Sequence, residues 1–170
     1  MMEKLGSSFF CQHTINVAQA LLGKTLVFGS YQGIITETEA YRGQDDEASH
    51  AFRGMTPRAS IMFGRAGLSY VYFIYGKYYC LNIITEPEGE PGGVLIRGIK
   101  LINSPLPITG PGKICRVLGI TTAHNGLDLT THDDFYITSS GQKNFTFQST
   151  PRIGIKKAID KHWRFVMYPS

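Results

Sequence analysis

The residues best suited to catalysis lie close together in the stretch "ITETEAYRGQDDEASHAFRGMTPR", residues 35–58. Five of the thirteen acidic residues fall within residues 36–50, and they are Glu37, Glu39, Asp45, Asp46 and Glu47. Arg42 is the one base in this window, so the rest of the chain holds 16 bases against 8 acids. A basic protein that concentrates its carboxylates in one place has a local use for negative charge, and general base catalysis is one such use.

A strand over residues 36–41 would place Glu37, Glu39 and Tyr41 on one face, because side chains alternate along a strand. Two carboxylates on one face are costly to bury unless the face is wet or functional. Two interpretations stay open on spacing alone. The segment is either a solvent-facing edge strand or the wall of a pocket in which one carboxylate serves as a general base.

A second cluster is aromatic, with five tyrosines within ten residues: Tyr70, Tyr72, Tyr75, Tyr78 and Tyr79. Tyr70 and Tyr72 should point the same way, and Tyr75 falls at a turn before Gly76. Core packing is the usual role of an aromatic stripe, although each buried tyrosine hydroxyl then needs a partner. The functional interpretation is a platform for stacked bases, with a tyrosine at the turn that enters a base stack.

Other motifs are weaker. The five histidines lack metal-ligand spacing and there is no CxxC pair, so we expect no metal and no cofactor. "GPGK" at 110–113 lacks P-loop spacing; a turn-to-helix junction is the plainer interpretation and a phosphate site the alternative. The acids at 45–47 are interpreted as structural, capping a loop that positions His50.

The composition suits one globular domain, residues 1–170, with 42% hydrophobic and 12% aromatic residues. The sequence pI near 9.0 favours an anionic partner, most simply nucleic acid. No apolar run reaches membrane-spanning length, and the N-terminus has no signal-peptide core. Cys11, Cys80 and Cys115 are odd in number and widely spaced, which indicates reduced thiols. We expect a cytoplasmic protein, nucleoid-associated if prokaryotic, with no membrane partner.

The elements that position these residues are predicted to be short. Helices are expected in "HTINVAQALLGKTLV" with Thr14 at the N-cap and Gly23 after the end, in "TPRASIMFG" with Thr56 at the N-cap, and in "GPGKICRVLGI" up to Gly119. Strands are expected in "TLVFGSYQGIITETEAY", "LSYVYFIYGKYYCLNIIT", "GGVLIRGIKL" and "RFVMY", the second of these being a hairpin broken at Gly76. This pattern predicts an α+β fold with a curved, mostly antiparallel, partly open barrel-like sheet flanked by short helices.

Eight blocks carry a family pattern in one order over nearly the whole length: "ALLGKTLV", "ETEAYRGQDDEASHAFRGMTPR", "MFGRAGLSYVYFIYGKYYCLNI", "GGVLIRG", "GPGKICRVLGI", "NGLDLT", "PRIGI" and "WRF". With these blocks the chain resembles the 3-methyladenine DNA glycosylases of the alkyladenine (mammalian-type) family. It departs from them at Ala59 in "TPRAS", where relatives have Asn, which predicts the loss of a local hydrogen bond.

The resemblance implies roles for nine residues. Glu39 corresponds to the general base that activates the attacking water, and Arg97 and the backbone carbonyl of Ile153 correspond to the other groups that hold this water. The remaining six bind the flipped nucleotide or its surroundings. Tyr41, His50 and Tyr72 sandwich the purine, Tyr75 fills the gap left in the duplex, and Asn82 and Leu95 form the floor that selects among purines.

The implied activity is that of a monofunctional DNA glycosylase that starts base excision repair. It flips alkylated or deaminated purines out of duplex DNA and hydrolyses the N-glycosidic bond, with no lyase step, as a monomer without metal. The expected lesions are 3-methyladenine and 7-methylguanine, with hypoxanthine and ethenoadenine as further candidates. Two alternatives stay open: a non-catalytic nucleic-acid-binding module that uses tyrosine stacking, and a carbohydrate hydrolase whose two carboxylates, Glu37 and Glu39, lie ~7 Å apart.

Overall fold

The structure, a computed structural model, describes residues 3–169. Its helical elements are α1 (Ser7–Phe10), α2 (Thr14–Leu21), α3 (Pro111–Leu118) and two 3-10 turns, η1 (Ser60–Phe63) and η2 (Thr122–His124). Its strands are β1 (Lys24–Phe28), β2 (Tyr31–Tyr41), β3 (Ser69–Ile74), β4 (Tyr78–Ile84), β5 (Gly93–Leu101), β6 (Ile108–Thr109), β7 (Phe135–Gly141), β8 (Phe145–Thr150) and β9 (Arg164–Pro169). The domain predicted over residues 1–170 includes residues 1, 2 and 170, which lie outside this described part.

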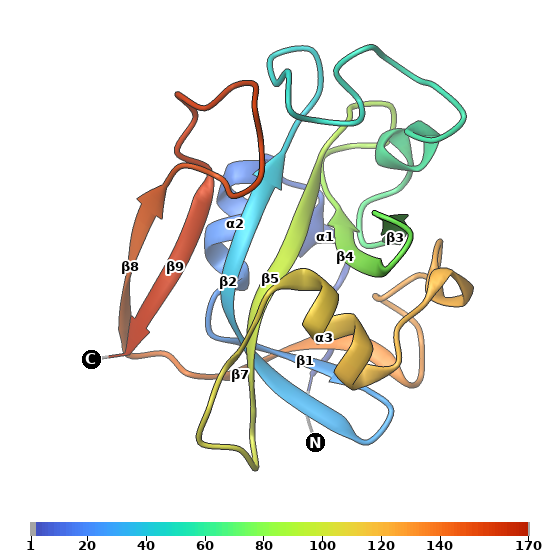
Figure 1. Cartoon of the computed structure of the whole chain (residues 1–170). Coiled ribbons are helices and arrows are strands. Elements are labelled where there is room, and N and C mark those ends of the chain that lie inside the picture. The colour runs from blue at the N-terminus through green and yellow to red at the C-terminus, as the bar shows by residue number, and fades with distance from the viewer. Residues whose placement is uncertain (1–2, 170) are drawn as a thin grey trace.

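These strands form one antiparallel sheet whose main order is β3-β4-β5-β2-β1-β7. The short strand β6 pairs with β5, and β9 pairs with both β2 and β8. In the view of Figure 1, α2 lies behind β2 and β5, whereas α3 lies in front of β5. The buried core includes Leu21 of α2, Ile114 of α3 and Ile35 of β2. The predicted α+β class with a mostly antiparallel sheet is therefore confirmed.

The acid-bearing strand β2 lies in the middle of the sheet. One edge pairs with β5 over residues 33–41. The other edge pairs first with β1 over residues 31–34 and then with β9 over residues 37–39. The register shifts on both sides of Glu37, which marks a bulge. The edge-strand interpretation of this segment is therefore wrong, because both sides of the strand are paired.

The ends of α2 and α3 show which capping predictions hold. Gly23 directly follows the C-cap of α2 with φ of 82°, and Gly119 caps α3 with φ of 85°, as expected for glycine in the left-handed region. The predicted N-cap Thr14 is wrong, since His13 caps α2 through its side chain. Thr14 is the first helical residue, and its N–H and hydroxyl both donate to Glu86 Oε2, at 2.8 and 2.7 Å. A carboxylate from a distant turn thus adds a second cap beside that of His13.

The helix predicted from Thr56 is shorter than expected. Only η1 forms, and its hydrogen bonds join Met62 N to Ala59 O and Gly64 N to Ile61 O, the i to i+3 pattern of a 3-10 turn. Thr56 Oγ1 accepts from Ala59 N at 3.2 Å, so it caps an isolated turn before η1. Ala59 itself is fully buried in a small cluster with Met62 and Tyr70, a position that an apolar side chain suits. None of the helices within residues 3–169 is long and apolar enough to cross a membrane.

Candidate active site

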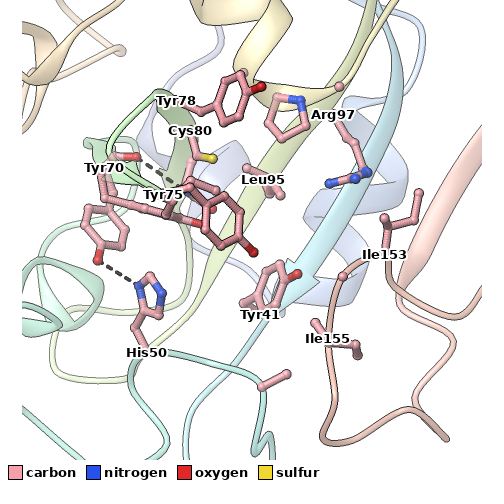
Figure 2. Close-up of a pocket in the computed structure, with 18 of the residues that line it drawn as sticks. Tyr41, His50, Tyr70, Tyr75, Tyr78, Cys80, Leu95, Arg97, Ile153 and Ile155 are labelled. Atoms are coloured by element: carbon pink, nitrogen blue, oxygen red, sulfur yellow. Dashed lines mark hydrogen bonds between the residues drawn. The ribbon is translucent and has the colours of Figure 1, made fainter.

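A cavity of about 540 Å³ opens between the β3–β4 hairpin, the end of β2, the start of α3 and the segment 153–155. Figure 2 shows its labelled side chains converging on this space from several elements. Eight of the nine residues that the family resemblance singles out line it, and they are Tyr41, His50, Tyr72, Tyr75, Asn82, Leu95, Arg97 and Ile153. The ninth, Glu39, lies behind three of them.

Glu39 is fully buried, yet every group that binds it lines the cavity. Its Oε1 accepts a hydrogen bond of 2.8 Å from the hydroxyl of Tyr41. Its Oε2 accepts 2.8 Å from the backbone N–H of Ile153 and lies 3.5 Å from Nε of Arg97. Because an ionised carboxylate accepts about four hydrogen bonds, these contacts do not use the full acceptor capacity of the group.

A second carboxylate lies on the same side of β2 but away from the cavity. Glu37 Oε2 is 3.4 Å from Arg97 Nε and accepts 2.8 Å from Arg164 Nε on β9. Two acids and two arginines thus alternate, which offsets the cost of burying Glu37 (7% exposed) and Glu39 (0% exposed). The shared face predicted for Glu37, Glu39 and Tyr41 is confirmed by their common contacts.

The aromatic wall is built by His50, Tyr70 and Tyr72. The His50 ring centroid lies 4.7 Å from that of Tyr72, and Tyr70 and Tyr72 are 5.2 Å apart, so the two tyrosines point the same way as predicted. Tyr70 supports the wall through a 2.9 Å hydrogen bond between its hydroxyl and His50 Nδ1. Burial raises the pKa of Tyr72 above its usual value, and burial with the nearby Glu39 carboxylate does the same for Tyr41. Both hydroxyls therefore stay protonated at neutral pH.

Burial lowers the pKa of His50 from 6.5 to about 4, and the nearby Arg58 adds to this effect. The unfolded chain therefore binds a proton at higher pH than the folded one, so the free energy of unfolding should fall as pH drops from about 6.5 towards 4. We predict that His50→Gln reduces this loss. Urea unfolding of both proteins near pH 7 and near pH 5 measures it. Parallel pH dependence in the two proteins would contradict a neutral, partly buried His50.

The floor of the cavity comes from β4 and β5. Asn82 and Leu95 are paired across these strands, and both are buried. The Asn82 side-chain amide donates to the carbonyl of Tyr70 at 3.3 Å. Burial raises the pKa of the Cys80 thiol to about 11, so it stays a neutral lining group. Within residues 3–169, no group of three or more His, Cys, Asp or Glu is arranged to hold a metal ion.

The rim carries Tyr75 and Tyr78. Tyr75 adopts φ of 55° at the hairpin turn before Gly76 and is 81% exposed, and its ring projects over the cavity in Figure 2. Tyr78 packs against Gly112 of α3, where a Cβ would lie 2.6 Å from the tyrosine ring. Gly112 of "GPGK" therefore admits the hairpin, and both glycines of the motif line the cavity. The sequence placed Tyr70 and Tyr78 in a candidate stacking cluster and Gly112 in a candidate phosphate site. It predicted neither the bond of Tyr70 to His50 nor the packing of Tyr78 on Gly112.

The acidic loop at 45–47 has the structural role predicted for it, at least at Asp46. This carboxylate accepts from the backbone N–H groups of Arg42 and Ala48, at 3.0 and 3.1 Å, and so fixes the loop that leads to His50. It also binds Arg152, a contact that the sequence did not predict.

Comparison with known proteins matches residues 8–170 to the family described as "Methylpurine-DNA glycosylase (MPG)". Similar chains are named "Putative 3-methyladenine DNA glycosylase". The one from Ehrlichia ruminantium (strain Welgevonden) is 52% identical over 98% of this chain and 90% of its own. Those from Wolbachia sp. subsp. Brugia malayi and Sodalis glossinidius are 54% and 53% identical, over 98% and 95% of either chain.

Proposed function

The chain belongs to the methylpurine-DNA glycosylase family, and on this premise we propose that it is a monofunctional 3-methyladenine DNA glycosylase. It flips a damaged purine out of duplex DNA, hydrolyses the N-glycosidic bond and leaves the abasic strand intact. The observation that supports this most strongly is the buried carboxylate of Glu39, whose three partners all line an aromatic cavity. We further propose that it acts as a cytoplasmic monomer that needs no metal.

The proposed chemistry follows from the charge that develops on the sugar. Cleavage of the N-glycosidic bond leaves an oxocarbenium-like ring, which a nearby carboxylate stabilises while it deprotonates the attacking water. Glu39 supplies the carboxylate, and the water lies at the cavity edge between Arg97 and Ile153. Ile153 reaches Glu39 through its N–H, and its carbonyl accepting from the water is a further part of the proposal.

The lesions that we propose as substrates follow from the aromatic side chains that line the cavity. 3-Methyladenine and 7-methylguanine are cationic, and stacking on Tyr41 and Tyr72 provides cation–π attraction of about 0.5–2 kcal/mol. His50 is neutral because burial lowers its pKa to about 4, so this side of the wall adds no like charge at neutral pH. Hypoxanthine and ethenoadenine are neutral and depend on shape and hydrogen bonding at Asn82 and Leu95. Tyr75 takes the place of the flipped base in the stack.

The direct test is single-turnover release of base from duplex DNA that contains 7-methylguanine or hypoxanthine. We expect free base and an abasic strand that stays uncut until alkali is added. Borohydride trapping of the chain on DNA, through Lys113 or another lysine, would contradict the monofunctional mechanism, because it reports a Schiff base. Binding without release would favour the non-catalytic module.

The carbohydrate hydrolase alternative has no support in the site. A two-carboxylate mechanism places the acids on either side of the bond that breaks. Glu37 and Glu39 instead face the same nitrogen of Arg97, and the other partner of Glu37, Arg164, lies outside the cavity lining.

A further inference from the structure

A buried ion pair outside the cavity joins two distant parts of the chain. Asp46 and Arg152 lie 106 positions apart in the sequence, and both side chains are fully buried. The guanidinium donates from both terminal nitrogens to the two carboxylate oxygens, at 2.7 Å each. Neither residue lines the cavity. Burying two charges is costly even when they are paired, so the position of this pair calls for a reason.

The guanidinium of Arg152 is attached to the strand that carries the proposed base. It donates 2.9 Å to the carbonyl of Ala40, which stands between Glu39 and Tyr41. It also lies 4.7 Å from the centre of the Tyr41 ring and 5.2 Å from that of Trp163. Arg152 therefore fixes the backbone after Glu39 and supports the Tyr41 wall.

The same residue fixes the segment that closes over Glu39. Ile153 follows Arg152 directly, and its N–H donates 2.8 Å to Glu39 Oε2. Ile153 is itself 45% exposed, so its own packing does little to hold it in place. Through Asp46, the pair is also joined to the loop that leads to His50.

We propose that Asp46 and Arg152 form a positioning pair that aligns the Ile153 N–H and the Tyr41 hydroxyl on Glu39; this rests on the proposed function of Glu39. The proposed effect of the pair on Glu39 is geometric, because Arg152 holds the Ala40 carbonyl and the Tyr41 ring in place. Neither residue touches substrate. The pair aligns the general base Glu39 and the Tyr41 wall, which serve every lesion. Its loss should therefore slow the release of cationic and of neutral damaged purines to the same extent.

The test uses Arg152→Lys and Asp46→Asn. Lysine keeps the charge but lacks the planar fork that binds both oxygens and stacks on Tyr41. Asparagine keeps the shape of Asp46 without its charge. We expect single-turnover release of 7-methylguanine and of hypoxanthine to fall about tenfold in both variants, since small displacements of catalytic groups have large rate effects. Affinity for duplex DNA with an uncleavable 2′-fluoro lesion should not change.

The pH dependence separates positioning from simple loss of folded protein. An ionised carboxylate that loses a donated hydrogen bond accepts a proton more readily, so the acidic limb of the pH–rate profile should move to higher pH in Arg152→Lys, the variant that keeps both charges of the pair. Thr14→Val is the stability control, because it removes a buried hydroxyl bonded to Glu86 and Thr85 outside the cavity. It should lower the free energy of unfolding and leave the rate per folded molecule and the profile unchanged.

Three outcomes are distinguishable. Slower release of base by fully active protein, together with the shifted pH–rate profile, supports the positioning role of the pair. A lower titre in which each active molecule keeps the wild-type rate and profile would overturn it, and so would an unchanged rate. If the wild-type protein released no base at all, the proposed function itself would fail, whatever the variants did.

Discussion

Glu39→Gln is expected to bind damaged duplex DNA as tightly as the wild-type protein and to release the base about a thousandfold more slowly or worse. Glutamine has the shape of glutamate, and its oxygen can still accept from the Ile153 N–H. The neutral amide, however, can neither take a proton from water nor stabilise a positive sugar, and these effects are worth about 10²–10⁴ for a positioned base. Single-turnover release of base from duplex DNA that contains 7-methylguanine checks the expected loss of rate. Binding to a duplex with an uncleavable lesion checks the expected affinity.

Glu37→Gln is the matched comparison, since it makes the same change two residues away on the same face. Glu37 touches Arg97 and Arg164 but not the cavity, so its loss should disturb Arg97 and slow release about tenfold. Equal and complete loss in both variants would restore a two-carboxylate mechanism. Undiminished release by Glu39→Gln would leave the glycosylase assignment in place but would show that Glu39 is not its general base.

Elements marked by strong local patterns could be predicted from the sequence. The β3–β4 hairpin was recognisable from its aromatic strands and the Gly76 turn, and β2 from the alternation in "TETEAY". The strands β7 and β8 were not predicted. β8 pairs with β9 and is largely exposed, so its side chains show no alternation between core and solvent. Its strand character comes from its partner, which the local sequence does not reveal.

The candidate site shows the same division between local and distant contacts. Alternation along one strand was enough to place Glu37, Glu39 and Tyr41 together. The cap of α2 by Glu86 joins residues 72 positions apart, and the contact of Asp46 with Arg152 joins residues 106 apart. Such contacts depend on how loops run after folding, and no spacing rule relates their positions. The approach of Ile153 through its N–H, rather than a side chain, likewise depends on the path of residues 151–155.

Tyr75→Ala should release base from duplex DNA about 30-fold more slowly than wild type, yet act almost normally on the same lesion in a single strand. Stacking of a base on an aromatic ring is worth about 1–3 kcal/mol, and about 1.4 kcal/mol corresponds to a tenfold change. Only the duplex has a gap that the ring must fill when the lesion leaves the stack, so only there is this stabilisation lost. Paired single-turnover assays on both substrates measure the ratio.

The exposure of Tyr75 makes this variant informative. The side chain is 81% exposed at a turn, so its removal should change the free energy of unfolding by no more than about 0.5 kcal/mol. Tyr31→Ala is the control, since Tyr31 is a 39% exposed tyrosine at the β1–β2 turn, outside the cavity lining. An equal loss on duplex and single strand would mean that Tyr75 contacts the lesion itself. In that case the hairpin tip would be a third wall of the base site, and another group would have to hold the duplex open.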